Sequence, residues 1–151
     1  MDTKLRELLH AADDPMHAEF PPGFDRVALW SRVAALQPKV ERIVGRAFKL
    51  DNTAEDASFS IDLTIEQPAA EQNWIDTVFA VRFSNFGNFF TTWSHCETEQ
   101  LSERVIAEVV AEVERVGFRY IPATALDEPY TGRHPEVGCI YTWWIRFFDY
   151  I

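Results

Sequence analysis

The chain has 151 residues, of which 24 are acidic and 14 basic, so its formal net charge at pH 7 is −10. This length predicts one domain, residues 1–151, and an apolar content of 47% excludes an intrinsically disordered chain. The longest stretch without a formal charge, residues 83–96, is shorter than the roughly 18 residues that a membrane helix needs. With no secretory signal expected either, we predict a cytoplasmic protein that does not enter membranes.

The spacing of apolar residues predicts three helices in the first fifty residues. The first should end before Pro15, and the second should end at Pro38, because proline disfavours helical geometry in the residue before it. Pro38 suits the first turn of a third helix, although Arg46–Leu50 could instead form a strand. The apolar residues that would share helix faces are Leu5, Leu8, Leu9 and Ala12, then Val27, Trp30, Val33, Ala34 and Leu36, then Val40, Ile43, Val44, Ala47 and Phe48.

Residues 58–66 and 75–83 alternate apolar and polar side chains, which is typical of strands with one buried face. Antiparallel pairing with both apolar faces on the same side requires that opposite residues have numbers with an even sum. If the numbers of paired residues sum to 142, Phe59 lies opposite Phe83, and the residues between the two strands form the connecting loop. These two segments therefore predict a β-hairpin.

A third strand, Phe89–Ser94, is predicted to follow a turn at residues 85–88, where Asn and Gly tolerate positive φ. Ser94–Glu97 has the spacing of a capping box and predicts a long amphipathic helix over about 97–116. Gly117 stands where a left-handed cap would end that helix.

The chain ends with an aromatic run, Cys139–Tyr150, which follows a short segment, Phe118–Ile121, and a loop. The run is apolar on both faces, so its composition favours a doubly covered strand, with a strand passing into a short helix as the alternative. All these elements together predict an α+β domain: N-terminal helices, an antiparallel meander of three to five strands, and helices over one face of the sheet. The other face should stay partly wet.

Four side chains near the end of the first predicted helix have the residue types of a metal site: His10, Asp13, Asp14 and His17. Pro15 interrupts the helix that would place them on one face, and their spacing matches no standard zinc motif. A solvated helix end is the favoured interpretation, and we expect no metal.

Cys96 and Cys139 are too few for a disulfide framework, and we expect free thiols in a reducing compartment. Cys96, near the predicted helix start, and His134, in a loop, form a conceivable nucleophile–base pair. The structural interpretation is favoured, with Cys96 packed as a small hydrophobe. No phosphate loop, serine elbow or dinucleotide fingerprint occurs, so we expect neither catalysis nor a cofactor.

Charge is unevenly distributed along the chain. Residues 1–50 carry 8 basic and 7 acidic side chains (+1), whereas residues 51–151 carry 6 and 17 (−11). Such acidity disfavours nucleic acid and anionic lipid as ligands and permits a basic protein partner. We expect charge from Asp62, Glu66 and Asp76, with an exposed aromatic side chain, Phe86 or Phe90, as an anchor for that partner. In the antiparallel register proposed above for residues 58–66 and 75–83, Glu66 would lie opposite Asp76.

The leading hypothesis is a non-enzymatic acidic protein-binding module that neutralises a basic partner. In charge, size and lack of a catalytic motif the chain is similar in kind to the bacterial immunity proteins, which neutralise basic toxins. The alternative is a small-molecule binding protein or an enzyme of unknown reaction with an aromatic-lined pocket. A homo-oligomer, with Cys139–Ile151 as an interface strand, is a further possibility.

Overall fold

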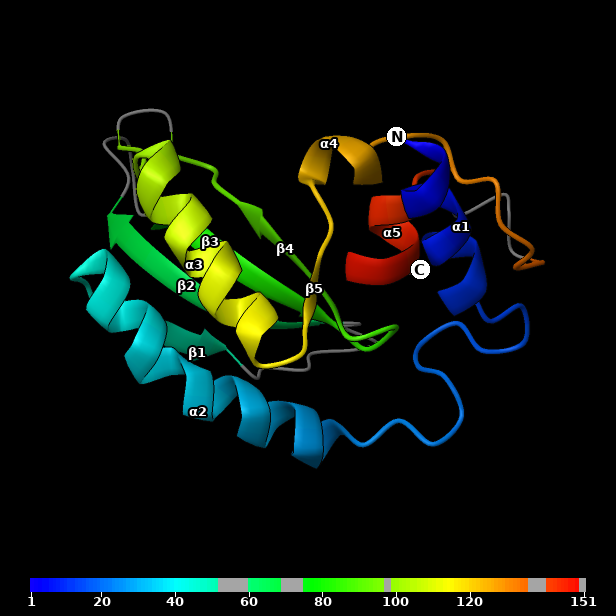
Figure 1. The fold of residues 1–151 in the computed structure, drawn as a ribbon, viewed down its shortest axis with the longest axis horizontal. Coiled ribbons are helices and arrows are strands. Elements are labelled where there is room, and N and C mark those ends of the chain that lie inside the picture. The colour runs from blue at the N-terminus through cyan, green and yellow to red at the C-terminus, as the bar shows by residue number, and fades with distance from the viewer. Residues whose placement is uncertain (52–59, 69–74, 97–98, 136–140, 150–151) are drawn as a thin grey trace.

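A computed structural model describes residues 1–51, 60–68, 75–96, 99–135 and 141–149. Its helices are α1 (Thr3–Ala12), α2 (Arg26–Val44), α3 (Glu103–Arg115), α4 (Ala123–Leu126) and α5 (Trp143–Phe148). Its strands are β1 (Lys49–Asp51), β2 (Ser60–Pro68), β3 (Ile75–Ser84), β4 (Phe89–Trp93) and β5 (Arg119–Tyr120). Helices α2 and α3 lie side by side over one face of the sheet, whereas α1, α4 and α5 form a group beside it (Figure 1).

The strands form one sheet in the order β1-β2-β3-β4-β5. Strands β1 to β4 are antiparallel neighbours, which confirms the predicted α+β meander. Strand β5 pairs parallel with β4, because α3 carries the chain back along the sheet before β5 begins. In the described part of the chain no helix is long and apolar enough to cross a membrane.

The register between β2 and β3 differs from the prediction by two residues. Ile61, not Phe59, lies opposite Phe83, and the pairing is interrupted by a bulge between Ile65 and Glu66. Phe59 itself lies outside the described residues. A shift of two keeps the same side chains on the buried face, so the alternating pattern fixed the face but not the register.

Helix α2 continues through Pro38, so the predicted break at this residue is wrong. Pro38 is exposed and its ring faces away from the core, while the helix positions before and after it bury an unbroken apolar stripe. That burial outweighs the lost backbone hydrogen bond. The helix ends at Gly45, whose φ of 76° is left-handed and whose N–H donates to the Glu41 carbonyl at 2.8 Å. The buried stripe consists of Leu29, Val33, Leu36 and Val40.

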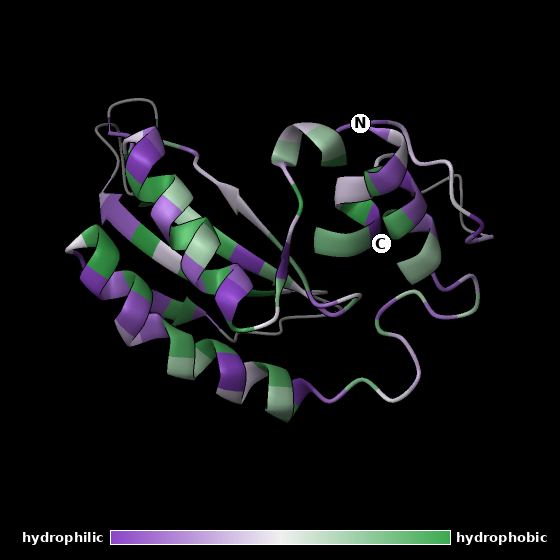
Figure 2. Cartoon of the chain, in the orientation of Figure 1, coloured by the Kyte–Doolittle hydropathy of each residue, from purple (hydrophilic) through white to green (hydrophobic). Residues whose placement is uncertain are grey.

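Helix α3 begins later than predicted. Its N-cap is Ser102, whereas the Ser94 hydroxyl accepts from the Cys96 N–H at 3.3 Å within the segment before it. Glu97, the other half of the proposed capping box, lies outside the described residues. The left-handed Gly117 after the helix is confirmed, with φ 90°. Figure 2 shows α2 and α3 banded with hydrophobic and hydrophilic residues, as helices with one buried face require.

Buried apolar side chains form two clusters. One lies between the sheet and helices α2 and α3, and the other joins α1, α4 and α5 to the β3–β4 turn. The predicted aromatic strand over Cys139–Tyr150 is wrong for its described part, because Trp143–Phe148 forms helix α5 in the second cluster. A short helix buried on most sides shows no apolar period, so its sequence resembles that of a doubly covered strand. The second cluster comprises Leu9, Phe86, Phe89, Ile121, Leu126, Tyr130, Trp143, Phe147 and Phe148.

Candidate functional site

The segment between α1 and α2, residues 13–25, is here called the connector. It runs from the group of α1, α4 and α5 to the start of α2 (Figure 1). Its ends are fixed by two aspartates: Asp13 follows the last turn of α1, and Asp25 caps α2 by accepting from the Ala28 N–H at 2.9 Å. Prolines at positions 15, 21 and 22 and Gly23, with φ 77°, keep the segment from forming a helix.

A buried arginine from α5 holds the first half of the connector. The Arg146 side chain is fully buried, and its Nε lies 2.7 Å from Asp13 Oδ1. Its Nη1 donates to the Ala18 carbonyl at 3.0 Å, and its Nη2 donates to the carbonyls of Asp14 and His17 at 2.9 and 3.1 Å. One guanidinium thus fixes three backbone carbonyls and one carboxylate, and it closes a contact across more than 120 residues of chain.

The other oxygen of Asp13 binds the loop before α5. Asp13 Oδ2 accepts from the Tyr130 hydroxyl at 2.7 Å and from the Arg133 N–H at 2.9 Å. Burial alone would raise the pKa of Asp13. The hydrogen bonds from Arg133, Tyr130 and Arg146 together lower the pKa by more than burial raises it, so the pKa of Asp13 lies below its usual value of 3.8. Burial also raises the pKa of Tyr130 to about 12. Both groups therefore keep one protonation state near neutral pH and act as structural partners.

Further hydrogen bonds fix the outer part of the connector. The Asn85 amide, from the β3–β4 turn, donates to the Glu19 carbonyl at 3.1 Å. Asp14 accepts from the Met16 N–H at 2.8 Å and lies 3.0 Å from the His17 ring nitrogen. The Met16 hydrogen bond, supported by His17, holds the pKa of Asp14 below its usual 3.8. The backbone from Asp14 to Glu19 is therefore held by side chains from two other parts of the fold.

This fixed backbone presents apolar side chains to solvent. Met16 is 80% exposed and Phe20 48% exposed, and Val27, in the first turn of α2, is 74% exposed. The Phe20 ring stacks on the Phe24 ring with centroids 6.0 Å apart, which limits the rotamers of Phe20. The two exposed apolar side chains of the connector itself, Met16 and Phe20, are here called its apolar tip.

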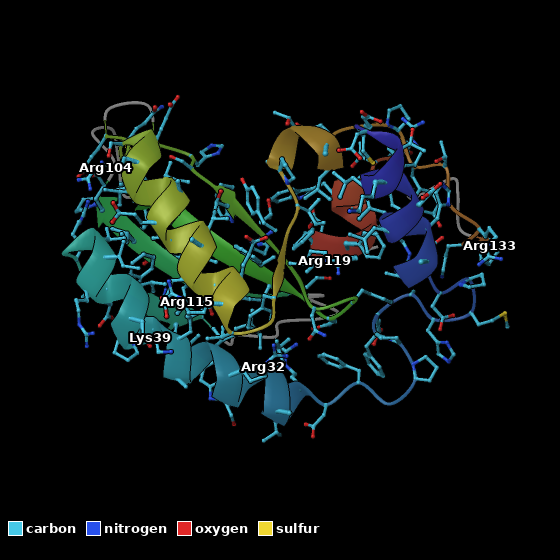
Figure 3. The ribbon with its side chains drawn as sticks, in the orientation of Figure 1. Arg32, Lys39, Arg104, Arg115, Arg119 and Arg133 are labelled. Atoms are coloured by element: carbon cyan, nitrogen blue, oxygen red, sulfur yellow. The ribbon has the colours of Figure 1, made fainter. Side chains whose placement is uncertain are left out.

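Within the connector itself the formal charges have one sign, although Arg26 follows it directly and the exposed Arg133 lies beside Asp13. The connector contains four carboxylates and no lysine or arginine, and one of them, Asp13, is neutralised by Arg146. Six of the 14 basic residues lie on the two long helices, four on α2 and two on α3. Figure 3 shows some of these cations over the helical layer, together with Arg119 from β5. Apart from the buried Asp13, the connector's own formal charges are thus acidic, and it also carries the exposed side chains of Met16 and Phe20.

The structure does not place the predicted aromatic anchors on the surface. Phe86 and Phe90 are both fully buried. Phe86 packs in the second cluster, 5.6 Å from the Phe147 ring and 4.4 Å from the Arg146 guanidinium, and Phe90 packs against Phe83 in the first. The expectation that a turn exposes its aromatic residue failed because α5 packs over this turn.

Asp62 lies on the sheet face opposite α2 and α3, bound to an arginine. Its carboxylate accepts from Arg82 Nε at 2.9 Å and from Nη2 at 2.7 Å, and the guanidinium lies 5.1 Å from the Trp93 ring and 5.6 Å from the Trp144 ring. Burial raises the pKa of Asp62 above the usual 3.8, despite the opposing effect of Arg82. Because Arg82 neutralises this carboxylate, Asp62 offers little net charge to a partner.

The predicted pairing of Glu66 with Asp76 is also wrong. The bulge in β2 places Glu66 opposite Thr77, and Asp76 opposite Gln67. Glu66 instead forms an ion pair with Lys49 of β1 at 3.1 Å. Because Phe86 and Phe90 are fully buried, the five residues predicted for partner binding cannot all face a partner.

The candidates for catalysis and metal binding are separated in space. Cys96 is buried in the first cluster, where the Gln67 amide donates to its Sγ at 3.1 Å, whereas His134 is buried beside Tyr130 of the second cluster. In the described ranges no group of three or more His, Cys, Asp or Glu side chains could hold a metal ion. Of the four helix-end candidates, Asp14 pairs with His17 while Asp13 binds Arg146 and His10 packs edge-on against Trp143.

Two hollows near α3 bear on the alternative of an aromatic-lined pocket. A groove of about 480 Å³ lies between α1, α3 and β5, and a neighbouring hollow of about 390 Å³ runs along α3. Tyr120 lines both, and their other lining residues are aliphatic or charged. Neither hollow has the aromatic lining that the alternative requires.

Sequence reasoning missed the connector, yet two signals point to it. Arg146 is the one charged residue between Trp143 and Phe148, and an arginine in an apolar run must be paired when the run is buried. Phe20 stands between Glu19 and a Pro-Pro-Gly sequence, where a loop conformation is forced on an aromatic residue.

Comparison with protein-family models, curated proteins and solved structures finds no match for the chain.

Proposed function

We propose that this protein is a non-enzymatic protein-binding module that holds a basic protein partner with its connector. The neutralising role of immunity- and inhibitor-like proteins is the biological setting that we propose for this binding. The observation that carries the proposal is the connector itself: Arg146 fixes its backbone from a buried position while Met16 and Phe20 stay exposed.

Burying a guanidinium requires that its lost hydration be replaced by hydrogen bonds. A segment that only joined two helices would not need this, because surface connections are ordinarily tolerant of motion and sequence change. A loop that is already ordered loses less conformational entropy when a partner binds. The contacts of Arg146 with Asp14, His17 and Ala18 therefore favour a recognition role for the connector.

The side chains that the connector presents match the anatomy of protein interfaces. Such interfaces have an apolar centre in which aromatic and methionine side chains are enriched, surrounded by a polar rim. Met16, Phe20 and Val27 supply the apolar side chains, and the exposed carboxylates of Glu19 and Asp25 supply the rim. A net charge of −10 would also steer a basic partner toward the protein and speed association at low salt.

The test uses the native chain and single variants as capture reagents. Native protein and Phe20→Ala are immobilised in parallel and exposed at low salt to a lysate of the organism that encodes the protein. We expect the native protein to retain a basic protein that Phe20→Ala does not retain, with an affinity for the purified partner at least about tenfold lower in the variant. The matched control is Ile75→Ala, which removes another exposed apolar side chain, 66% exposed at the start of β3.

Charge is tested separately from the apolar tip. Glu19→Gln removes one exposed carboxylate of the connector, and Glu7→Gln removes one exposed carboxylate of α1. We expect Glu19→Gln to slow association with the purified partner at low salt, by about two- to fivefold, and Glu7→Gln to slow it less. Equal losses of binding in Phe20→Ala and Ile75→Ala, or a captured partner that is acidic, would contradict the proposal.

A further inference from the structure

Met16 is the most exposed of the large hydrophobic side chains described here, at 80%, and it lies in the first half of the connector. Its own N–H is bonded to Asp14, so its backbone is fixed although its side chain is free of the core. The chain has two methionines, and the other, Met1, is partly buried against the second hydrophobic cluster. The Met16 thioether is therefore mostly exposed to solvent, whereas the Met1 side chain packs against other side chains.

We propose that Met16 is an oxidation site for hydroperoxides, and that its sulfoxide releases the partner bound by the connector. A lone pair of the Met16 sulfur attacks the distal oxygen of the hydroperoxide, a sulfur–oxygen bond forms and the O–O bond breaks. The sulfur loses two electrons, and the hydroperoxide is reduced to water or, from an alkyl hydroperoxide, to the alcohol. A proton from solvent completes the leaving group, and the hydroperoxide's own proton returns to solvent.

The consequence for binding follows from the place of Met16 in the apolar tip. A sulfoxide is polar and strongly hydrated, so burying it in an apolar interface requires removing that hydration. Met16 adds little to the core, because four-fifths of its surface is exposed, so oxidation leaves the fold intact. The same chemistry at Met1 would act on a side chain that packs against the second cluster. This inference rests on the proposed function, and it adds a reversible control to the same surface.

The first measurement needs no partner. The native protein is treated with a limiting amount of hydrogen peroxide, and peptide mass spectrometry follows the gain of one oxygen atom at Met16 and at Met1. We expect Met16 to be oxidised at least about threefold faster, with circular dichroism unchanged, because access governs the reaction. Equal rates at the two methionines would overturn the assignment of Met16 as the selective site.

The second measurement uses the partner captured by native protein. We expect oxidised protein and Met16→Gln, which carries a polar side chain of similar length, to bind at least about tenfold more weakly. Met16→Leu should bind as the native protein does and keep that affinity after peroxide, and a methionine sulfoxide reductase should restore the oxidised native protein. Undiminished binding by oxidised native protein overturns the inference alone, whereas loss of specific capture by the reduced native protein overturns the proposed function.

Discussion

Among the described residues, the Arg82–Asp62 pair is mostly buried and the Arg146–Asp13 pair fully so, and the two arginines use their donors differently. Arg82 directs its Nε and Nη2 to Asp62 and only its Nη1 to a backbone carbonyl, that of Phe148. Arg146 gives Asp13 a single hydrogen bond and gives three to the backbone of the connector. The first pair is mainly a neutralised charge on a sheet, and the second is mainly a support for a loop.

The surroundings of the two carboxylates differ in the same way. Asp62 depends on its arginine, and burial raises its pKa. Asp13 also accepts from Tyr130 and Arg133, so its pKa is lowered although its side chain is more deeply buried. Buried arginine–aspartate pairs can therefore have different structural roles. The groups that bind the remaining donors of the arginine and the remaining oxygen of the aspartate determine which part of the chain the pair positions.

Among the polar contacts compared, the largest effect should come from removing Arg146, with the removal of Arg82 as its counterpart. Arg146→Met leaves the Asp13 charge buried without its cation and removes the donors of three carbonyls, so we expect a loss of about 4 kcal/mol in the free energy of unfolding. Arg82→Met leaves a partly exposed carboxylate that can take up a proton, and we expect about 2 kcal/mol. Urea denaturation of both variants measures the difference. Equal losses would mean that the connector contacts add nothing.

The next effect tests how tightly the loop before α5 encloses Asp13. A Cβ added at Gly132 would clash with both Asp13 Oδ2 and the Tyr130 hydroxyl, so we expect Gly132→Ala to cost about 2–3 kcal/mol by displacing that network. Gly45→Ala is the control, because its Cβ meets no atom within 4 Å and only its positive φ of 76° is strained. That strain should cost about 1 kcal/mol. Thermal denaturation of both variants measures the two losses of stability. If Gly132→Ala lost no more stability than Gly45→Ala, the contacts described around Gly132 would be contradicted.

The pH dependence of stability should separate the two carboxylates by sign. The folded pKa of Asp13 lies below its unfolded value, so its stabilisation is present above about pH 4 and is lost as pH falls through the folded pKa. The folded pKa of Asp62 lies above its unfolded value, so its contribution is present in acid and is lost as pH rises through the folded pKa.

Substitution should therefore change the acid limb of the stability profile in opposite directions. Between pH 5 and 3, Asp13→Asn should lose stability less steeply than the native protein, and Asp62→Asn should lose it more steeply. Urea denaturation at a series of pH values gives these slopes. Parallel slopes for the two variants would show that the carboxylates do not differ as described.

The smallest effect should appear at the tip of the connector. Phe20→Ala should change the free energy of unfolding by about 0.5 kcal/mol or less, because the ring is half exposed and its main contact is Phe24. Phe86→Ala is the contrasting variant, and we expect it to cost about 3–5 kcal/mol because the ring is fully buried. A large loss of stability in Phe20→Ala would make Phe20 a structural residue and remove it from the proposed interface.

The fold was more accessible to sequence reasoning than the site was. The alternation in residues 58–66 and 75–83 has a period, and so does the apolar stripe of α3, which made β2, β3 and that helix predictable. Helix α5 has no such period, and a register shift of two residues between β2 and β3 leaves the alternation unchanged. Local patterns predict local elements, and their ends and pairings depend on distant contacts.

The connector was missed for a related reason. The acceptors of Arg146 are mostly backbone carbonyls, which every residue has, so no residue type marks them in the sequence. The anchors chosen from the sequence were Phe86 in the predicted turn and Phe90 in the predicted third strand, and each is buried by elements far away in the chain. A lone arginine within an apolar aromatic run was the available sign that a buried polar contact would be made.

The measurement that tests the central claim most directly is the backbone mobility of the connector without any partner. Nitrogen-15 NMR relaxation of the native protein gives order parameters for residues 14–20, to be compared with those of α2. If Arg146 fixes the connector in advance of binding, these order parameters should be close to those of the helix, at about 0.85. Values below about 0.6 for residues 14–20 would show a loop that moves freely and would contradict a pre-formed recognition surface.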